Sequence, residues 1–425
     1  MKIYIDTFGC TFNQADSQIM AGLLKENNLS LTSSIEDADV IIINTCYVKH
    51  PTEQKVITKI QKLNESFPDK KLIISGCMVE IDPIKLVKTS PNASWIGPHK
   101  IQNIVDIVKS VVEGNIIRDT GYSNKSKVGL PKIRSNPLIH IIQICEGCDG
   151  ACSYCCTRFA RGSLQSYSIE TIKKEAEQAI YEGCKEIQLT AQDSAAFGKD
   201  SGESLPDLMN NITDIEGDFK VRVGMMHPKS MMDDVKEIIK AFKHDKFYKF
   251  LHIPIQSGNN KVLTDMNRCH SVEEFKTILT MFKKEIPDIS ISTDIIVGYP
   301  TEDDNAFSDT MKLIQEIKPD FLHISKYKHR PGTSSSNLKE IEYETMKKRS
   351  KALKDLKERI AIENNRKFIR TNQRVLVTNK GSKGGYVART NSYKTVIIEN
   401  ADIGTFSDVI IKDAKPTYLI GSPII

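Results

Sequence analysis

The arrangement of apolar runs between residues 138 and 327 restricts the fold of this chain more than any other feature. Six β-rich runs occur there, at 138–144, 185–190, 219–225, 249–255, 289–299 and 320–327. Helical patterns separate them, near 168–183, 206–213, 230–243, 259–285 and 303–317. Such alternation predicts parallel strands joined by right-handed helical crossovers. Six strand–helix units are too few for an eight-fold barrel, so we predict an open, partial (βα)6 barrel.

A second, shorter alternation occupies roughly the first hundred residues. Strands are expected at 2–6, 38–45 and 71–75, and helices near 13–27, 51–66, 82–89 and 100–113. The strands are almost uniformly apolar, which is typical of strands that are covered on both faces. We therefore predict an N-terminal parallel α/β domain with helices on both sides of its sheet.

The rest of the chain divides into a linker and a C-terminal module. Residues 114–137 are polar, rich in Gly, Ser, Asn and Pro, and without periodicity, which indicates a linker. A charged helix is expected near 340–368, followed by short β runs with Gly-bearing turns that are typical of a small β-barrel. The predicted class is α/β. The predicted boundaries are an N-terminal domain at 1–113, a linker at 114–137, a central barrel at 138–365 and a C-terminal β-barrel at 366–425.

Five of the ten cysteines lie within twelve positions, from 145 to 156. Cys148, Cys152 and Cys155 follow the first strand of the predicted barrel, at the end where barrel enzymes have their active sites. Three thiolates on one short loop can bind three irons of a [4Fe–4S] cluster and leave the fourth iron open. Zinc is the alternative, because Cys145 supplies a second C-x2-C pair. Disulfides are not expected, because the chain shows no signal peptide or membrane span and we expect it to be cytoplasmic.

Three further cysteines are far from this group in the sequence. Cys10, Cys46 and Cys77 each stand just beyond the C-terminal end of one of three successive predicted strands. Because the carboxyl ends of parallel strands meet at one edge of a sheet, we expect the three side chains to converge there. They too can bind three irons of a cubane cluster. Three unrelated loop cysteines are the alternative.

The remaining cysteines fit neither set. Cys145 and Cys156 are expected to be buried thiols beside the cluster loop. Cys184 and Cys269 lie inside helical patterns, where a buried free thiol is the ordinary arrangement.

The positive charge of the chain is concentrated at its C-terminus. The chain has 59 Lys and Arg against 54 Asp and Glu, a net charge of +5. Residues 366–425 contain ten Lys or Arg and four Asp or Glu, a balance of +6, so all other residues sum to −1. A basic module on a nearly neutral body suggests a polyanionic partner. A basic face that is merely solvated is the alternative.

The order Cys-x3-Cys-x-aromatic-Cys, with Tyr154 as the aromatic residue, resembles the signature of radical S-adenosylmethionine (SAM) enzymes. Essentially the whole chain is similar to the methylthiotransferases of that superfamily. The similar segments are TFGCTFNQADS (7–17), NTCYVKHPTEQK (44–55), SGCMVE (75–80), GCDGACSYCCTRFARG (147–162), LTAQDSAAFG (189–198), RVGMMHP (222–228), LHIPIQSGNNKVLTDMNR (251–268), DIIVGYPTE (294–302) and RPGTSS (330–335). The C-terminal sixty residues resemble the TRAM domain, a small β-barrel that binds tRNA.

Within the family, the motifs most resemble the archaeal and eukaryotic branch, which modifies N6-threonylcarbamoyladenosine at tRNA position 37. The resemblance implies methylthiolation at C2 of that base, two [4Fe–4S] clusters, and SAM as methyl donor and radical source. It also implies an electron donor, a sulfur source and the anticodon loop of tRNA as partners. The implied ligands are Cys148, Cys152 and Cys155 for the SAM-binding cluster, and Cys10, Cys46 and Cys77 for an auxiliary cluster.

Other polar residues near the ends of the barrel strands are candidates for SAM contacts, with ordinary loop hydrogen bonding as the alternative. They are Gln192, Asp193, Gln256, Ser257 and Gly298. Arg158 and Arg161 follow the cluster loop and either meet phosphates or the cofactor carboxylate, or are solvated or structural. Polar candidates for a threonylcarbamoyl pocket are Arg222, His227, Lys229, Lys326, Lys328, His329 and Arg330. No general acid or base is assigned, because the cofactors supply the difficult chemistry.

Three other functions are compatible with these patterns. Methylthiolation of isopentenyladenosine in tRNA and modification of a protein side chain would use the same two cysteine sets. A tRNA-binding protein with a structural iron site needs a closed ligand set, whereas each set here is one ligand short. The basic C-terminal module favours RNA over protein, because phosphate neutralisation supplies most non-specific affinity.

Overall fold

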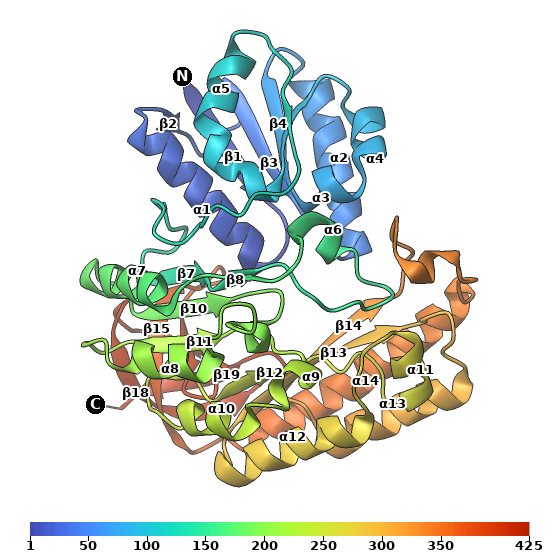
Figure 1. The fold of residues 1–425 in the computed structure, drawn as a ribbon. Helices are drawn as coiled ribbons and strands as arrows, with labels where there is room; N and C mark the ends of the chain where they lie inside the picture. The colour runs from blue at the N-terminus through green and yellow to red at the C-terminus, as the bar shows by residue number, and fades with distance from the viewer. Residues whose placement is uncertain (425) are drawn as a thin grey trace.

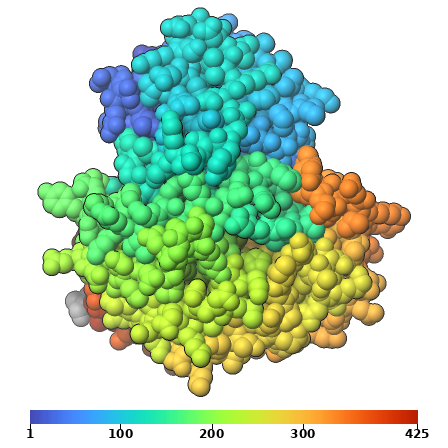
Figure 2. All heavy atoms as spheres, viewed as in Figure 1, coloured from blue at the N-terminus to red at the C-terminus, as the bar shows by residue number. Residues whose placement is uncertain are grey.

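The computed structural model describes residues 1–424, which form an N-terminal α/β lobe, a central partial barrel and a C-terminal β-barrel (Figure 1). Figure 2 shows the N-terminal lobe, coloured blue to cyan, above the green and yellow central part. Among the described residues, no helix is long and apolar enough to cross a membrane. The predicted α/β class, with a partial barrel and a small C-terminal barrel, is confirmed.

The N-terminal lobe is built on a six-stranded parallel sheet with the order β2-β1-β3-β4-β5-β6. Its strands are β1 (Lys2–Thr7), β2 (Ser30–Leu31), β3 (Val40–Thr45), β4 (Lys71–Gly76), β5 (Ser94–Ile96) and β6 (Arg118–Asp119). Its helices are α1 (Thr11–Glu26), α2 (His50–Ser66), α3 (Cys77–Ile81), α4 (Pro83–Thr89) and α5 (Ile104–Val112). Val40 and Ile42 of β3 pack into one apolar cluster and Ile41 and Ile43 into another. Both faces of the sheet are therefore covered, as the apolar strands predict.

Three short strands of this sheet have no counterpart among the predicted elements. β2, β5 and β6 have only two or three residues each. Such strands are too short for a hydrophobic pattern to be recognised. β6 lies within the segment predicted as a linker and pairs with β5.

The central part consists of two three-stranded parallel sheets with the orders β11-β10-β7 and β12-β13-β14. A parallel bridge between Val221 and Phe247 links them into one open array. The strands are β7 (Ile139–Gln143), β10 (Glu186–Thr190), β11 (Lys220–Val223), β12 (Phe250–His252), β13 (Ser290–Val297) and β14 (Phe321–Lys326). The main helices are α7 (Ile169–Tyr181), α8 (Leu205–Thr213), α10 (Val235–Phe242), α12 (Val272–Glu285), α13 (Asp304–Ile317) and α14 (Tyr343–Arg366). Shorter elements are β8 (Cys145–Glu146), β9 (Gln165–Ser166), α6 (Thr157–Arg161) and α9 (Pro228–Met231).

The helix predicted at 259–285 is in fact two helices, α11 (Asn260–Asp265) and α12. Asn267 and Cys269, between them, have φ angles of 53° and 54°, a left-handed conformation that interrupts a helix. Ser271 then begins α12 with a capping box. The apolar residues keep a helical period across this turn because α11 and α12 both pack on the same barrel.

The C-terminal part is a closed barrel with the strand order β15-β16-β17-β19-β18. Its strands are β15 (Asn372–Lys380), β16 (Tyr386–Thr390), β17 (Thr395–Ile398), β18 (Phe406–Ala414) and β19 (Leu419–Pro423). The ring of Tyr393 packs against Tyr248 and Phe250, with centroids 4.8 and 5.0 Å apart. Lys394 forms an ion pair with Asp320 at 2.7 Å. The C-terminal barrel therefore covers the N-terminal ends of the central strands.

Candidate functional site

Cys10, Cys46 and Cys77 lie at one edge of the N-terminal sheet. Cys10 immediately precedes α1, Cys46 directly follows β3, and Cys77 is the first residue of α3, directly after β4. Because β1, β3 and β4 are neighbours in the sheet, the loops at their C-terminal ends are adjacent, as the sequence predicts. Cys46 and Cys77 are buried, whereas Cys10 is exposed.

Gly9 and Asn13 hold these loops together. Gly9 has a φ angle of 116°, and a Cβ atom there would lie 2.5 Å from Cys46 Cβ, so this approach requires glycine. Asn13 Nδ2 donates to the carbonyl oxygen of Thr45 at 2.8 Å. Asn13 Oδ1 accepts a hydrogen bond from Cys77 Sγ at 3.8 Å. The start of α1 thus contacts the loops of the other two cysteines.

Cys148, Cys152 and Cys155 lie on the loop between β8 and α6, past the C-terminal end of β7. The Gly150 amide donates to Cys148 Sγ at 3.3 Å. Arg268 Nη1 donates to Cys152 Sγ at 3.6 Å. Hydrogen bonds of this kind orient a sulfur ligand and stabilise its thiolate form.

Burial raises the pKa values of two thiols in each set. Loss of solvation raises the pKa of Cys46 to about 12 and that of Cys148 to about 11. It also raises the pKa values of Cys77 and Cys155, and in each set the neighbouring thiols add to the rise. These four thiols are therefore neutral on their own, and iron would bind them as thiolates with release of protons. Soft sulfur donors of this kind suit an iron–sulfur cluster.

The two sets differ from a site for a single metal ion. Among residues 1–424, no three Cys, His, Asp or Glu side chains converge closely enough to hold one ion. In a cubane, however, each thiolate binds a different iron, so the sulfurs need not converge. All ten cysteines are free thiols and thus available as ligands. The chemistry and placement of both sets fit a cluster with one open iron.

Four buried charges lie between the two cysteine sites, and we call them the inter-site network. Arg161 of α6 forms ion pairs at 2.8 Å with Asp16 of α1 and with Glu146 of β8. Lys127 pairs with the same two carboxylates at 2.9 Å. The network therefore fastens the N-terminal lobe to the segment that bears the cluster loop.

Arg161 also contacts the N-terminal cysteine edge. Its Nη2 donates at 2.8 Å to Asn13 Oδ1, the same oxygen that accepts from Cys77 Sγ. Of the two roles considered for this arginine, the structural one is the one observed. Arg158, three residues earlier on α6, is exposed.

The cysteines outside the two sets are mostly placed as predicted. Cys145 and Cys156 are buried beside the cluster loop, and Cys156 shares an apolar cluster with Cys77. Cys184 is buried, but it lies in the loop before β10 and not in a helix. The prediction for Cys269 is wrong, because it is exposed in the turn that separates α11 from α12.

Two of the SAM candidates follow β10 and are engaged within the chain. Gln192 Oε1 accepts a hydrogen bond from the Gly147 amide, next to the cluster loop, at 2.7 Å. Asp193 is buried, and its carboxylate accepts from Ser230 Oγ at 2.6 Å and from the His227 amide at 2.9 Å. Both side chains therefore shape the loops around the cluster site.

The other three SAM candidates form turns after β12 and β13. Gln256 and Gly298 have positive φ angles of 78° and 81°. Ser257 Oγ accepts from the Asn259 amide at 3.3 Å. A Cβ atom at Gly298 would lie 2.2 Å from Met346 Cγ, so glycine permits α14 to pack there. The structure thus brings all five candidates to the barrel end that bears the cluster loop.

The seven polar pocket candidates do not form one group. Arg330 forms a buried ion pair with Glu53 that joins the central barrel to the N-terminal lobe. Arg222 lies on β11, with its guanidinium 5.4 Å from the ring centroids of both Phe250 and Tyr393. The other five cap a helix, contact surface partners or face solvent: His227, Lys229, Lys326, Lys328 and His329.

Sequence reasoning missed three polar side chains within the barrel strands. They are His252 on β12, Asp294 on β13 and His323 on β14. Each interrupts an otherwise mainly apolar strand, and that interruption was the signal that could have identified them.

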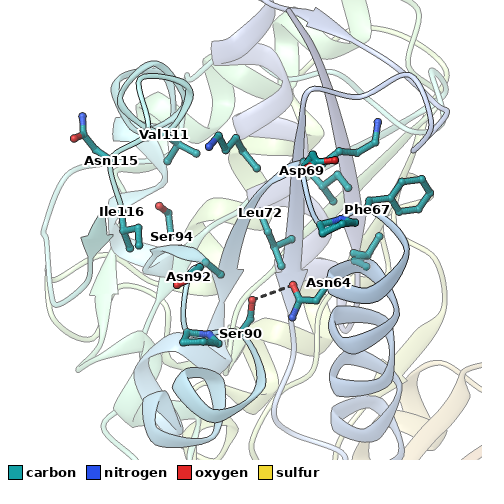
Figure 3. Close-up of a pocket in the computed structure, with 18 residues that line it drawn as sticks. Asn64, Phe67, Asp69, Leu72, Ser90, Asn92, Ser94, Val111, Asn115 and Ile116 are labelled. Carbon is teal, nitrogen blue, oxygen red and sulfur yellow. Dashed lines mark hydrogen bonds between the residues drawn. The ribbon is translucent and has the colours of Figure 1, made fainter.

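A cavity of about 480 Å³ lies at the opposite edge of the N-terminal sheet (Figure 3). Lys71 and Ser94, which begin β4 and β5, line it together with Asn64 and Ser90. Figure 3 shows the hydrogen bond of 3.2 Å from Ser90 Oγ to Asn64 Oδ1 at its border. No cysteine or SAM candidate lines this cavity.

Three family models match successive parts of the chain. Residues 2–97 match the model described as Uncharacterized protein family UPF0004. Residues 142–314 match the Radical SAM superfamily, and residues 366–424 match the TRAM domain.

Relatives match the chain over nearly its whole length. A probable threonylcarbamoyladenosine tRNA methylthiotransferase of Methanothermobacter thermautotrophicus is 55% identical, with 99% of each chain covered. One of Archaeoglobus fulgidus is 44% identical and covers 99% of this chain and 98% of its own. The Homo sapiens threonylcarbamoyladenosine tRNA methylthiotransferase is 34% identical over all of this chain and 74% of its own. Among solved structures, the radical S-adenosylmethionine methyltransferase TsrM from Kitasatospora setae shares the fold, with a TM-score of 0.57 at 11% identity over 79% of this chain and 75% of that one.

Proposed function

Because the chain belongs to the family of threonylcarbamoyladenosine tRNA methylthiotransferases, we propose that it adds a methylthio group to C2 of N6-threonylcarbamoyladenosine at tRNA position 37. The observation that supports this most is the presence of two three-cysteine sets on facing loops of the N-terminal lobe and the barrel. A tRNA-binding protein with a structural iron site would need a complete set of ligands, whereas each of these cysteine sets lacks one ligand.

The two sets are assigned to two [4Fe–4S] clusters. The barrel set would bind the cluster that chelates SAM, and the N-terminal set would bind an auxiliary cluster. When bound, these groups and SAM supply the radical removal of the C2 hydrogen and the methylated sulfur, with an external electron donor and sulfur source. The ligands are Cys148, Cys152 and Cys155 in the barrel, and Cys10, Cys46 and Cys77 in the N-terminal lobe.

The chain itself orients the cluster ligands and holds the two lobes together. Gly150 and Arg268 donate hydrogen bonds to the barrel sulfurs, and Gln192 fixes the start of the cluster loop. The inter-site network holds the cysteine loops of the two lobes in one relative position. Such rigidity matters, because a misplacement of about 1 Å can cost roughly 100-fold in rate.

The C-terminal barrel supports RNA as the substrate. Lys380 and Lys383, around the β15–β16 turn, and Lys412 on β18 are exposed. Exposed cations on this module are suited to phosphate contacts. The relatives described above are named for threonylcarbamoyladenosine tRNA, which favours that nucleoside over isopentenyladenosine and over a protein side chain.

Product analysis tests this proposal. The anaerobically reconstituted protein is incubated with SAM, a reductant, a sulfide source and either threonylcarbamoyladenosine tRNA or isopentenyladenosine tRNA. Mass spectrometry of the digested nucleosides should show the 2-methylthio derivative only with the first tRNA. Product from the isopentenyl substrate alone, or from neither, would refute the proposal.

A further inference from the structure

Three polar side chains project into the central barrel from neighbouring strands, and we call them the lumen triad. His252 ends β12, Asp294 lies within β13 and His323 within β14. These three strands are neighbours in one sheet (Figure 1). Their neighbours in the sequence belong to the apolar core that packs against the helices: Leu251, Ile295 and Leu322. Because successive side chains of a strand point to opposite faces, the triad faces the barrel interior.

Two members of the triad, His252 and Asp294, are hydrogen-bonded to each other, and the triad is not a metal site. His252 Nε2 lies 2.7 Å from Asp294 Oδ2, and the rings of His252 and His323 are 5.6 Å apart. Burial by itself would raise the pKa of Asp294, but the hydrogen bond and charge of His252 lower it, so the group is a carboxylate at neutral pH. The described part of the chain contains no three-ligand group for one metal ion, and the triad is no exception.

The triad has unused hydrogen-bonding capacity. The side chains of His252 and Asp294 are 16% and 24% exposed, and His323 is exposed although it lies on a barrel strand. Within residues 1–424, Asp294 accepts only the side-chain hydrogen bond of His252, and the His323 ring forms none. A carboxylate oxygen and an imidazole are therefore free to bind a ligand.

A pocket at the open edge of the barrel reaches one member of the triad, His323. It has a volume of about 120 Å³ and lies between β14, α14 and the C-terminal barrel, with His323, Lys357 and Tyr418 in its lining. Burial lowers the pKa of His323; the charge of Asp294 opposes this, but His252, Lys49 and Lys357 add to the lowering and the net shift is downward. Its ring is therefore neutral at pH 7 and has one N–H to donate. Lys357 and Lys394 line the pocket, and because Lys394 is paired with Asp320, Lys357 supplies the positive charge at this entrance, which suits a nucleotide.

We propose that the lumen triad binds one edge of the target adenine, with Asp294 accepting from N6–H and His323 donating to N7. The inference rests on the proposed function and assigns the groups that recognise its base. Adenine presents an N6–H donor beside an N7 acceptor on this edge, and a substituent on N6 leaves one N–H. The nucleotide enters flipped out of the RNA stack, through the pocket beside His323.

This orientation suits the proposed reaction. C2 lies on the opposite side of the adenine ring from N7, so a base bound by N6 and N7 directs C2 away from the triad. Asp294 lies three residues before the end of β13, which at ~3.3 Å per residue is roughly 10 Å below the strand ends. The cluster loop lies beyond that end of the barrel. C2 of the bound base is therefore directed away from the triad, into the part of the lumen that opens toward the cluster loop.

Binding of anticodon stem-loops tests the proposal without turnover. Asp294→Ala should weaken binding of a loop with threonylcarbamoyladenosine at position 37 by about 10- to 100-fold, because a hydrogen bond to a charged group is lost. Its binding of a loop that is abasic at position 37 should not change. Wild-type protein should prefer adenosine to 7-deazaadenosine at that position, and His323→Ala should lose this preference. Fluorescence anisotropy with labelled stem-loops measures each dissociation constant.

Controls separate recognition from misfolding and from SAM binding. Asp288→Ala, at an exposed position just before β13, should bind every loop as wild type does. Asp294→Ala should retain its iron and its RNA-independent SAM cleavage. The proposal is overturned if Asp294→Ala weakens binding of the abasic loop as much as that of the modified loop, or if it binds the modified loop within two-fold of wild type. Loss of SAM cleavage in this variant would also overturn it. If wild type forms product while Asp294→Ala binds normally, this inference fails alone; if wild type forms none, the proposed function fails.

Discussion

Replacing Arg161 by alanine tests the stabilising role of the inter-site network. The charges of Asp16, Glu146, Lys127 and Arg161 sum to zero, and each side chain is at most 2% exposed. Arg161→Ala leaves one uncompensated negative charge in the interior and removes the donor to Asn13 Oδ1. Removing one partner of a buried ion pair costs about 3–5 kcal/mol of unfolding free energy. We expect a loss in this range.

Urea unfolding of the iron-free protein at neutral pH measures this loss. Trp95 is the only tryptophan and is buried in β5, so its fluorescence reports the N-terminal lobe that the network fastens. Arg158→Ala is the matched control, because this exposed arginine lies on the same helix. It should change stability by no more than about 0.5 kcal/mol. A loss below about 1 kcal/mol for Arg161→Ala, or one equal to that of the control, would refute the reasoning.

Three further predictions concern other parts of the chain. Burial alone would raise the pKa of Glu175, but the charge of Lys132 lowers it from 4.5 to about 2. The Glu175 carboxylate therefore stabilises the fold above pH 4.5, and this contribution to the unfolding free energy is lost as the pH falls toward 2. Glu175→Gln should flatten that acid dependence in urea unfolding, and an unchanged slope would contradict the assignment. Tyr393→Ala should lower the unfolding free energy by about 3–5 kcal/mol and increase proteolysis between α14 and β15, because the ring anchors the C-terminal barrel. Unchanged proteolysis would argue against docking of the C-terminal barrel through this ring. Alanine at Lys380 and Lys383 should reduce the salt dependence of tRNA binding by about one unit of log–log slope each without affecting iron content, and an unchanged slope would exclude these phosphate contacts.

The sequence predicted the elements that have a strong periodic signal. The strands that precede Cys10, Cys46 and Cys77 are six residues long in the structure, and each contains three or four consecutive apolar residues, which made them recognisable. Their parallel arrangement follows from the intervening helices, and the common edge of the three cysteines follows from that arrangement. The positions of the barrel cysteines were predictable for the same reason.

What the sequence did not reveal depends on contacts between distant segments. The exposure of Cys269 follows from a left-handed turn that joins two helices of compatible period. Asp193 was a candidate ligand for SAM, yet Ser230 and a backbone amide far along the chain occupy its carboxylate. The docking of Tyr393 requires a φ angle of 63°, which is uncommon for a tyrosine and has no local sequence signal. Removing the whole C-terminal barrel would therefore expose the central barrel, so point substitutions on its surface test RNA binding more cleanly.

The central claim, that two separate cysteine sets each bind a cluster, is tested most directly by the iron content of anaerobically reconstituted protein. Wild type should contain about eight irons per chain, four for each cluster. Alanine at Cys148, Cys152 and Cys155 together should halve the iron and abolish SAM cleavage. Alanine at Cys10, Cys46 and Cys77 together should also halve the iron but leave SAM cleavage detectable. Full iron content in either triple variant would contradict the account.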